Sequence, residues 1–139
     1  MSPELHQYLP QNQSVIDVIC SGFSEAEGSF KKPTGYQRDV AGRWLKTLNY
    51  DAIGSRLFGE LSTSAQRIVL LLRTLVKNPP LLILDEPFQG LDTEHVRLLK
   101  DLLNRIAEES NCAVIFVTHI PKELPECFTL HLKLREGAV

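Results

Sequence analysis

Two adjacent carboxylates, Asp85 and Glu86, are the residues of this chain best placed to do chemistry. They follow four aliphatic residues at 81–84 and precede Pro87, so a strand buried on both faces is expected to end at them, where open α/β sheets bind ligands. Neighbouring anions repel each other unless a cation lies between them, and a divalent metal ion is the natural one. The pattern predicts that Asp85 holds magnesium and Glu86 polarises an attacking water. The alternative is a core strand that turns at Pro87 with its acids in solvent.

A histidine is expected close to these acids. His119 lies just after the apolar segment 113–117, which is a second candidate strand. Between the two strand segments, a helical pattern starts at Thr93 and has apolar residues at 96, 99, 102, 103 and 106. A strand, a helix and a strand in this order form a right-handed unit with parallel strands, so both strands end at one sheet edge. The acids and His119 therefore converge there, although a polar residue that merely ends a strand is the alternative for His119.

Two more helices are predicted in the first third of the chain. Ser14 is a favourable N-cap for a short apolar helix. Thr34 and Gln37 form a capping box for a second helix, in which Trp44 is expected to be a core residue rather than a ligand-stacking one. The following segment, 49–59, is expected to be a connector.

A third helix and a last strand complete the predicted α/β domain. Ser62 caps a helix of about sixteen residues, which a rise of ~1.5 Å per residue makes ~24 Å long. The Asn-Pro-Pro sequence at 78–80 ends this helix. The alternating segment 129–135 is typical of an edge strand. These elements predict a parallel sheet with flanking helices in one domain.

Composition argues against several classes of function. The net charge of −2 and the pI near 6.1 give no electrostatic reason to expect a nucleic-acid partner. The sequence contains no run of eighteen apolar residues and no secretory signal at its start, so we expect a cytoplasmic chain without direct membrane insertion.

The three cysteines are expected to be buried thiols without a function: Cys20, Cys112 and Cys127. Three histidines have no partner pattern and are expected at the surface: His6, His95 and His131.

The chain resembles the ATP-binding cassette (ABC) ATPases in four ordered motifs. These are the signature-like LSTSAQR at 61–67, the Walker B strand LLILDE at 81–86, the D-loop GLD at 90–92 and the switch histidine in VTH at 117–119. The resemblance implies an ABC-type P-loop NTPase fold and covers the whole chain, 1–139, as the C-terminal part of one cassette. Residues 1–60 would form the Q-loop end and the inserted helical subdomain, and residues 61–139 would carry the four motifs.

The resemblance implies a role for each motif residue, with ATP and Mg²⁺ as cofactors. Asp85 would hold the magnesium ion, Glu86 would act as general base, and His119 would contact the γ-phosphate region and the attacking water. Asp92 would reach across a dimer interface, although it could instead merely cap the helix that follows Leu91. The signature residues would offer hydrogen-bond donors at a helix start to the partner's nucleotide: Ser62, Thr63 and Ser64.

The implied function is ATP binding and hydrolysis in the complete protein, which would energise the transport of molybdate or of another substrate. The implied partners are a second ABC cassette in a head-to-tail dimer and a membrane transporter subunit, which would place the protein peripherally at the cytoplasmic face of the inner membrane.

The sequence departs from the family pattern in three places. It contains no G-x-x-x-x-G-K-[ST] loop, so the phosphate-loop strand is expected to lie outside this chain, which would be inactive alone. No Q-loop glutamine can be assigned, because Pro3 or Glu4 stands where one is expected. Ser64 and Ala65 stand where the family has Gly and Gln, and a side chain at Ser64 is expected to crowd the phosphate. The alternative function is therefore a non-catalytic regulatory or assembly cassette. A P-loop ATPase outside this family is disfavoured by the helical insert.

Overall fold

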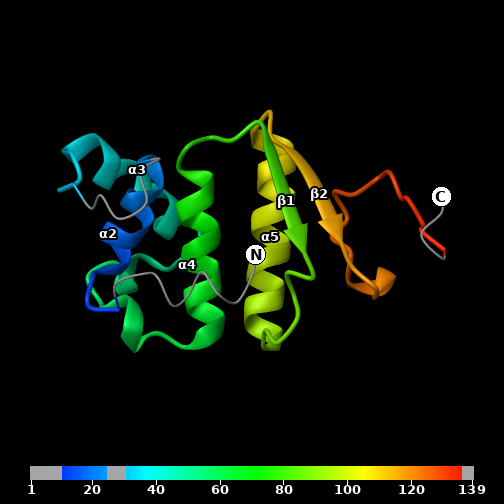
Figure 1. The fold of residues 1–139 in the computed structure, drawn as a ribbon, viewed down its shortest axis with the longest axis horizontal. Coiled ribbons are helices and arrows are strands. Elements are labelled where there is room, and N and C mark those ends of the chain that lie inside the picture. Colours follow the sequence, from blue (N-terminus) through cyan, green and yellow to red (C-terminus); the bar gives the residue numbers. More distant parts are fainter. Residues whose placement is uncertain (1–10, 25–30, 136–139) are drawn as a thin grey trace.

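The computed structural model describes residues 11–24 and 31–135. Helices α2, α3 and α4 lie side by side, and α5 lies next to α4 with the strands β1 and β2 beside it (Figure 1). The predictions for Pro3, Glu4 and His6 lie outside the described residues. The element bounds are α2 Val15–Cys20, α3 Gly35–Thr47, α4 Thr63–Leu75, β1 Leu81–Asp85, α5 Thr93–Glu109 and β2 Ala113–Val117.

The first two helices begin where the sequence predicts. The Ser14 hydroxyl accepts the amide of Asp17 at 3.2 Å, and this bond caps α2. Thr34 and Gln37 make both hydrogen bonds of the capping box at the start of α3. Trp44 is partly buried against the core, as predicted. These two helices pack with α4 around fully buried side chains: Val15, Val18, Ile19 and Leu45.

The connector 49–59 is more regular than predicted, because it contains the single 3₁₀ turn Asp51–Ile53 and leads into another, Phe58–Glu60. Its second half lies against the segment before α2. The amides of Val15 and Phe58 donate to the carbonyl oxygens of Arg56 and Gln13 at 2.9 and 2.8 Å. This backbone pairing fixes the point from which the chain enters α4.

Helix α4 is the central element of the fold. It has 13 residues, three fewer than predicted, because Asn78 adopts φ 51° and Pro79 follows it. Eight of its residues are buried, since α2 packs on one side and α5 on another. The packing with the turn after α2 is close: a Cβ on Gly22 would lie 1.9 Å from the carbonyl oxygen of Arg73. Glycine is therefore required at position 22.

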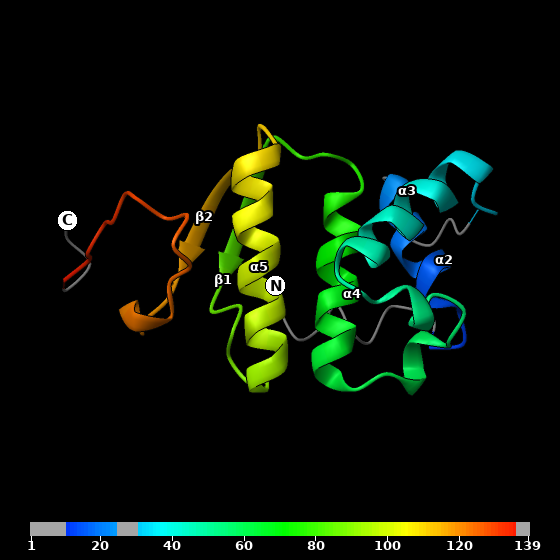
Figure 2. The same cartoon turned by 180° about the vertical axis from the view of Figure 1, so that it is seen from behind.

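The strand, helix and strand from β1 to β2 form the predicted parallel unit. Leu81 lies opposite Ala113 and Asp85 lies opposite Val117. The strands lie in front of α5 in Figure 1 and behind it in Figure 2, so α5 covers one face of the sheet. Leu82 and Leu84 are buried on that face, each 4% exposed.

The prediction that β1 is buried on both faces is wrong for the described chain. Burial alternates along β1, and no described element packs on the face of the sheet opposite α5. Four large aliphatic side chains of this face are 47–59% exposed: Leu81, Ile83, Ile115 and Val117. An aliphatic run indicates a favourable strand, but its burial depends on a second covering layer.

The edge strand predicted at 129–135 is also wrong. The structure has no strand there, and the described sheet contains only β1 and β2. Leu130, Leu132 and Leu134 are 92%, 72% and 63% exposed. An alternating pattern forms a strand only when a neighbour offers it hydrogen bonds and a surface on which to pack.

Candidate functional site

The acid–histidine cluster, which consists of Asp85, Glu86 and His119, forms where β1 and β2 end. The amide of Glu86 donates to the carbonyl oxygen of Val117 at 2.9 Å, so the pairing of the strands continues past β1. The carboxylate oxygen Oε1 of Glu86 lies 2.6 Å from His119 Nδ1 and accepts the His119 amide at 2.9 Å. The predicted convergence of Glu86 and His119 is confirmed.

Glu86 has an unusual backbone conformation. Its φ is 45°, in the left-handed region, although a non-glycine residue before proline favours extended backbone. Such strain persists only where the surroundings hold it, and it is common at functional sites. Here the bonds to Val117 and His119 hold Glu86, and the turn brings its carboxylate to the end of β2.

Each partner of the Glu86–His119 contact favours the charged form of the other. The hydrogen bond from the His119 side chain is the main cause that lowers the pKa of Glu86. The same bond and the charge of Glu86 raise the pKa of His119. The side chains of Glu86 and His119 are 28% and 71% exposed, so a ligand could compete for either group.

Asp85 lies on the uncovered face of the sheet and is exposed. The described residues contain no group of three or more His, Cys, Asp or Glu side chains that could hold a metal ion by themselves. Magnesium suits such a place, because it is commonly held by one or two carboxylates together with phosphate oxygens and waters. The single carboxylate of Asp85 fits that mode of binding.

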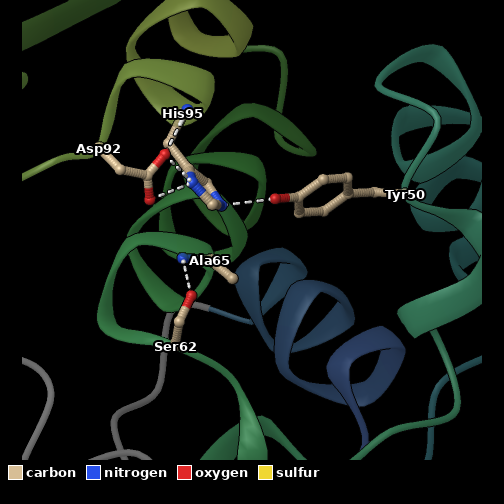
Figure 3. A network of polar contacts seen from close by, with 5 residues as sticks. All are labelled: Tyr50, Ser62, Ala65, Asp92 and His95. Atoms are coloured by element: carbon tan, nitrogen blue, oxygen red, sulfur yellow. Dashed lines mark hydrogen bonds and ion pairs between the residues drawn. The ribbon is translucent and has the colours of Figure 1, made fainter.

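The signature segment forms the exposed start of α4. Ser62 Oγ accepts the amide of Ala65 at 3.2 Å, so Ser62 is the N-cap (Figure 3). A hydroxyl that accepts one hydrogen bond can still donate another, so this cap remains compatible with ligand binding. Ser62 and Thr63 are exposed, whereas Ser64 is buried at 8%.

Asp92 is the N-cap of α5 and ends the D-loop. Its Oδ1 accepts the amide of His95 at 3.0 Å, and both carboxylate oxygens lie 2.7–2.8 Å from His95 Nδ1. The bonds from the His95 amide and ring, with a smaller contribution from the Ser64 side chain, lower the pKa of Asp92 to about 2. Asp92 is thus held by the first turn of its own helix, and Ser64 of the signature segment lies close enough to influence its pKa.

His95 corrects the prediction of a surface histidine, because its exposed fraction is 9%. Its Nε2 lies 2.6 Å from the Tyr50 hydroxyl, and Figure 3 shows the ring between Tyr50 and Asp92. The spacing of three residues from an N-cap aspartate was a signal for the bond with Asp92. Nothing in the sequence indicated Tyr50, which lies 45 residues away. His131 is exposed, as predicted.

A hydrogen bond joins α4 to the residue just before the D-loop. The Arg67 guanidinium donates to the carbonyl oxygen of Gln89. The next residue, Gly90, has φ 74°, which glycine adopts without strain, and the Arg67 nitrogens approach it. We define the signature–D-loop cluster as Tyr50, Ser62, Ser64, Asp92 and His95. The bond from Arg67 of α4 to Gln89 reinforces this cluster.

Two other features contribute no chemistry to these clusters. A cavity of about 450 Å³ lies between α2 and the start of α3, and its lining includes Asp17 and Arg38 but none of the predicted site residues. The cysteines are free; Cys20 is buried, while Cys112 and Cys127 are only half-buried, which corrects their predicted burial. Burial raises the pKa of all three thiols, which disfavours the reactive thiolate.

A protein-family model gives the class of this chain. The model described as "AAA domain, putative AbiEii toxin, Type IV TA system" matches residues 22–124. The chain belongs to this AAA-domain family, and its homologues are ATP-binding proteins of ABC transporters.

Particular relatives confirm the resemblance to ABC ATPases. The ABC transporter ATP-binding protein ModF of Escherichia coli is 34% identical over 134 residues, which are 96% of this chain and 27% of ModF. The molybdate import ATP-binding protein MolC of Haemophilus influenzae is 31% identical over 115 residues, which are 83% of this chain and 46% of MolC. The chain therefore spans about a quarter to about half the length of these curated relatives.

Solved structures confirm the fold. A structure described as "an inward-facing conformation of a putative metal-chelate type ABC transporter" matches 83% of this chain and 46% of its own, with a TM-score of 0.70 and 31% identity. The dimeric structure of the bacterial ABC transporter cassette MJ0796 matches 84% of this chain and 51% of its own, with a TM-score of 0.66 and 24% identity. The predicted ABC-type P-loop NTPase fold is thus confirmed. The described part of the chain has no helix long and apolar enough to cross a membrane.

Proposed function

We propose that the complete protein that contains this chain binds and hydrolyses ATP as an ABC-type ATPase. The observation that carries the proposal is the acid–histidine cluster. A strained glutamate at the end of one strand contacts a histidine at the end of its parallel neighbour at 2.6 Å, beside an exposed aspartate. Among the relatives, ModF and MolC are ATP-binding proteins, which supports the same activity here.

Glu86 is proposed as the general base that takes a proton from the attacking water. Its lowered pKa keeps it ionised at neutral pH but makes it a weak base while His119 is bound to it. A shift of His119 from Glu86 to the γ-phosphate region would restore the basicity of Glu86. The exposure of the His119 side chain, 71%, leaves room for that exchange.

Asp85 is proposed to hold Mg²⁺ together with the nucleotide. The bound ion would neutralise phosphate charge during the reaction. The position of Asp85 on the uncovered sheet face separates its role from that of Glu86, whose carboxylate is bound by His119 just after β2. The two adjacent acids can therefore serve different functions.

The signature–D-loop cluster is proposed to contact the nucleotide of a second ABC cassette in a head-to-tail dimer. Ser62, Thr63 and the backbone at Ser64 would donate to its γ-phosphate, and Asp92 would reach across the interface. The burial of the Ser64 side chain supports this proposal over a non-catalytic cassette, because the extra side chain lies inside the protein. The transported substrate would be molybdate or another small solute, delivered through a membrane subunit at the cytoplasmic face.

The decisive experiment compares two substitutions in the complete protein. Glu86→Gln should lower ATP turnover by about 10²-fold or more and leave MgATP binding nearly intact. Asp85→Asn should instead weaken the magnesium-dependent binding of ATP. Glu109→Gln, at the exposed end of α5, is the matched control and should change neither quantity. Equal and small losses of turnover in both site variants, without a loss of binding, would contradict these roles.

The chain alone is expected not to bind MgATP measurably. It contains no phosphate loop, and that loop supplies most of the charge-assisted contacts to a triphosphate. Titration calorimetry of this chain with MgATP is the measurement. Micromolar binding that depends on Asp85 would show that the phosphates are held by residues within the chain.

A further inference from the structure

Tyr50 and His95 form a polar connection that the proposed chemistry does not use. Tyr50 lies in the connector after α3 and is half-buried, while His95 lies in the first turn of α5 and is buried. Their rings meet edge to face, with centroids 6.2 Å apart and an interplanar angle of 85°. The hydroxyl of Tyr50 reaches Nε2 of His95 at 2.6 Å, and Figure 3 shows it approaching from the side opposite Asp92.

The chemistry of the three groups sets the direction of the bonds. The Asp92 carboxylate can only accept hydrogen bonds, so His95 Nδ1 must carry a proton. In the neutral ring Nε2 is then an acceptor, and the Tyr50 hydroxyl donates to it. Burial, followed by the charges of Glu94 and Asp92, raises the pKa of Tyr50, which preserves its hydroxyl as a donor. With the ring in that tautomer, the hydrogen bonds run from Tyr50 through His95 to Asp92.

This chain of hydrogen bonds ends at Asp92, whose carboxylate is bonded to His95 but remains partly exposed. The inner side of Asp92 is occupied by His95 and approached by Ser64, yet 55% of its side chain is exposed. The D-loop before it is fixed to α4 through the bond from Arg67 to Gln89. Helix α4 is therefore bonded to the residue just before the D-loop, and Ser64 lies close to the last D-loop residue, Asp92.

We propose that Tyr50 and His95 are positioning residues that hold Asp92 in a fixed relation to the signature turn. They make the exposed side of Asp92 and the exposed Ser62 and Thr63 one pre-formed surface for the partner cassette. The inference rests on the proposed function for its effect on turnover, and it extends that function to two residues outside the four motifs. A role as a catalytic relay is disfavoured, because the buried His95 ring uses both its nitrogens within the protein.

The test uses Tyr50→Phe in the complete protein, which removes one hydroxyl and keeps the ring. Turnover should fall about fivefold, the usual effect of one lost hydrogen bond, with the KM for MgATP unchanged. Amide hydrogen exchange should become faster at residues 89–95 and stay unchanged in α2 and α3. Tyr36→Phe is the matched control, because Tyr36 is 69% exposed and lies outside the cluster.

His95 supplies a graded comparison. His95→Asn keeps a side-chain donor near the position of Nδ1, whereas His95→Leu removes both bonds. The asparagine variant should therefore retain more turnover and slower exchange at residues 89–95 than the leucine variant. Equal losses in the two variants would overturn the inference, and so would a fall in turnover that follows a loss of protection throughout the protein.

The exchange measurement also separates this inference from the proposed function. If the wild-type protein has no ATPase activity, the proposed function fails, and local exchange in Tyr50→Phe still decides whether Tyr50 holds the D-loop. If ATPase activity is present, but Tyr50→Phe changes neither turnover by more than twofold nor exchange at residues 89–95, the positioning role is wrong.

Discussion

The two polar clusters of this protein are built in different ways. The acid–histidine cluster stands at the ends of two adjacent strands, and its histidine is 71% exposed. In the signature–D-loop cluster, a histidine whose side chain is 11% exposed joins the start of α5 to a distant connector. The first is held by strand pairing and one ion pair, whereas the second is held by helix caps that also stabilise the fold.

Because of this difference, we expect substitutions in the acid–histidine cluster to change mainly the chemistry, whereas substitutions in the signature–D-loop cluster also change stability. A side chain that is exposed and is not a cap can be replaced at small cost to folding, so its substitution isolates the chemical role. A side chain that caps a helix affects both the fold and the proposed interface. The predictions below test that division, from the largest expected effect to the smallest.

The largest effect is expected at His119. His119→Ala should lower ATP turnover of the complete protein by about 10²-fold, because the proposed contact with the γ-phosphate region is lost. The melting temperature should stay nearly unchanged, since the side chain is mostly exposed. His131→Ala, another exposed histidine, is the control for a steady-state ATPase assay and a thermal melt. A large fall in melting temperature for His119→Ala, but not for His131→Ala, would contradict the proposed separation of chemistry from stability.

Strand β1 allows a comparison between neighbouring residues. Leu84→Ala should lower the free energy of unfolding by about 2–4 kcal/mol, because Leu84 is 4% exposed against α5. Ile83→Ala should cost less than about 1 kcal/mol, because Ile83 is 59% exposed on the uncovered face. Urea unfolding measures both values. Equal costs would show that the face of Ile83 is covered in solution.

Ser62 is expected to show a smaller, mixed effect. Ser62→Ala removes the cap bond to Ala65 and should lower the free energy of unfolding by about 1 kcal/mol. Thr63→Ala at the adjacent exposed position is the control, because the Ser62 hydroxyl, not that of Thr63, caps α4. Urea unfolding of both variants checks the difference. An unchanged free energy of unfolding in Ser62→Ala would show that the Ser62 hydroxyl does not cap α4 in solution.

The smallest expected effect is a shift in the titration of His119. Glu86 raises the pKa of His119 above its ordinary value of 6.5, so Glu86→Gln should return it toward 6.5. The stabilisation that His119 contributes is fully present below pH 6.5 and is lost as the pH rises through its raised pKa. That of Glu86 is present above pH 4.5 and is lost as the pH falls through its lowered pKa. The Glu86–His119 ion pair is therefore fully formed between pH 4.5 and pH 6.5.

An NMR titration of the histidine ring protons measures this shift. His131 is exposed and lies outside the acid–histidine cluster, so its signal serves as the internal control. An unchanged His119 titration in the variant would mean that the contact with Glu86 does not form in solution.

The sequence was sufficient wherever neighbouring residues determine the structure. The caps at Ser14, Thr34 and Ser62 are local, because each side chain bonds an amide three residues away. The convergence of Glu86 and His119 also followed from the sequence, because a strand, helix and strand unit has one favoured arrangement. The length of α4 was overestimated, since Asn78 adopts a left-handed conformation before the two prolines.

What the sequence determined by itself is therefore the parallel unit, the position of the acids at its edge and the ABC family, because these depend on local periodicity and ordered motifs. Only the tertiary structure decided that His95 is buried between Tyr50 and Asp92, and that Ser64 is buried as well. It also decided that one face of β1 is uncovered and that 129–135 forms no strand. The physical reason is the same in each case: burial and pairing depend on which distant segments pack against a residue, and no local pattern encodes that contact.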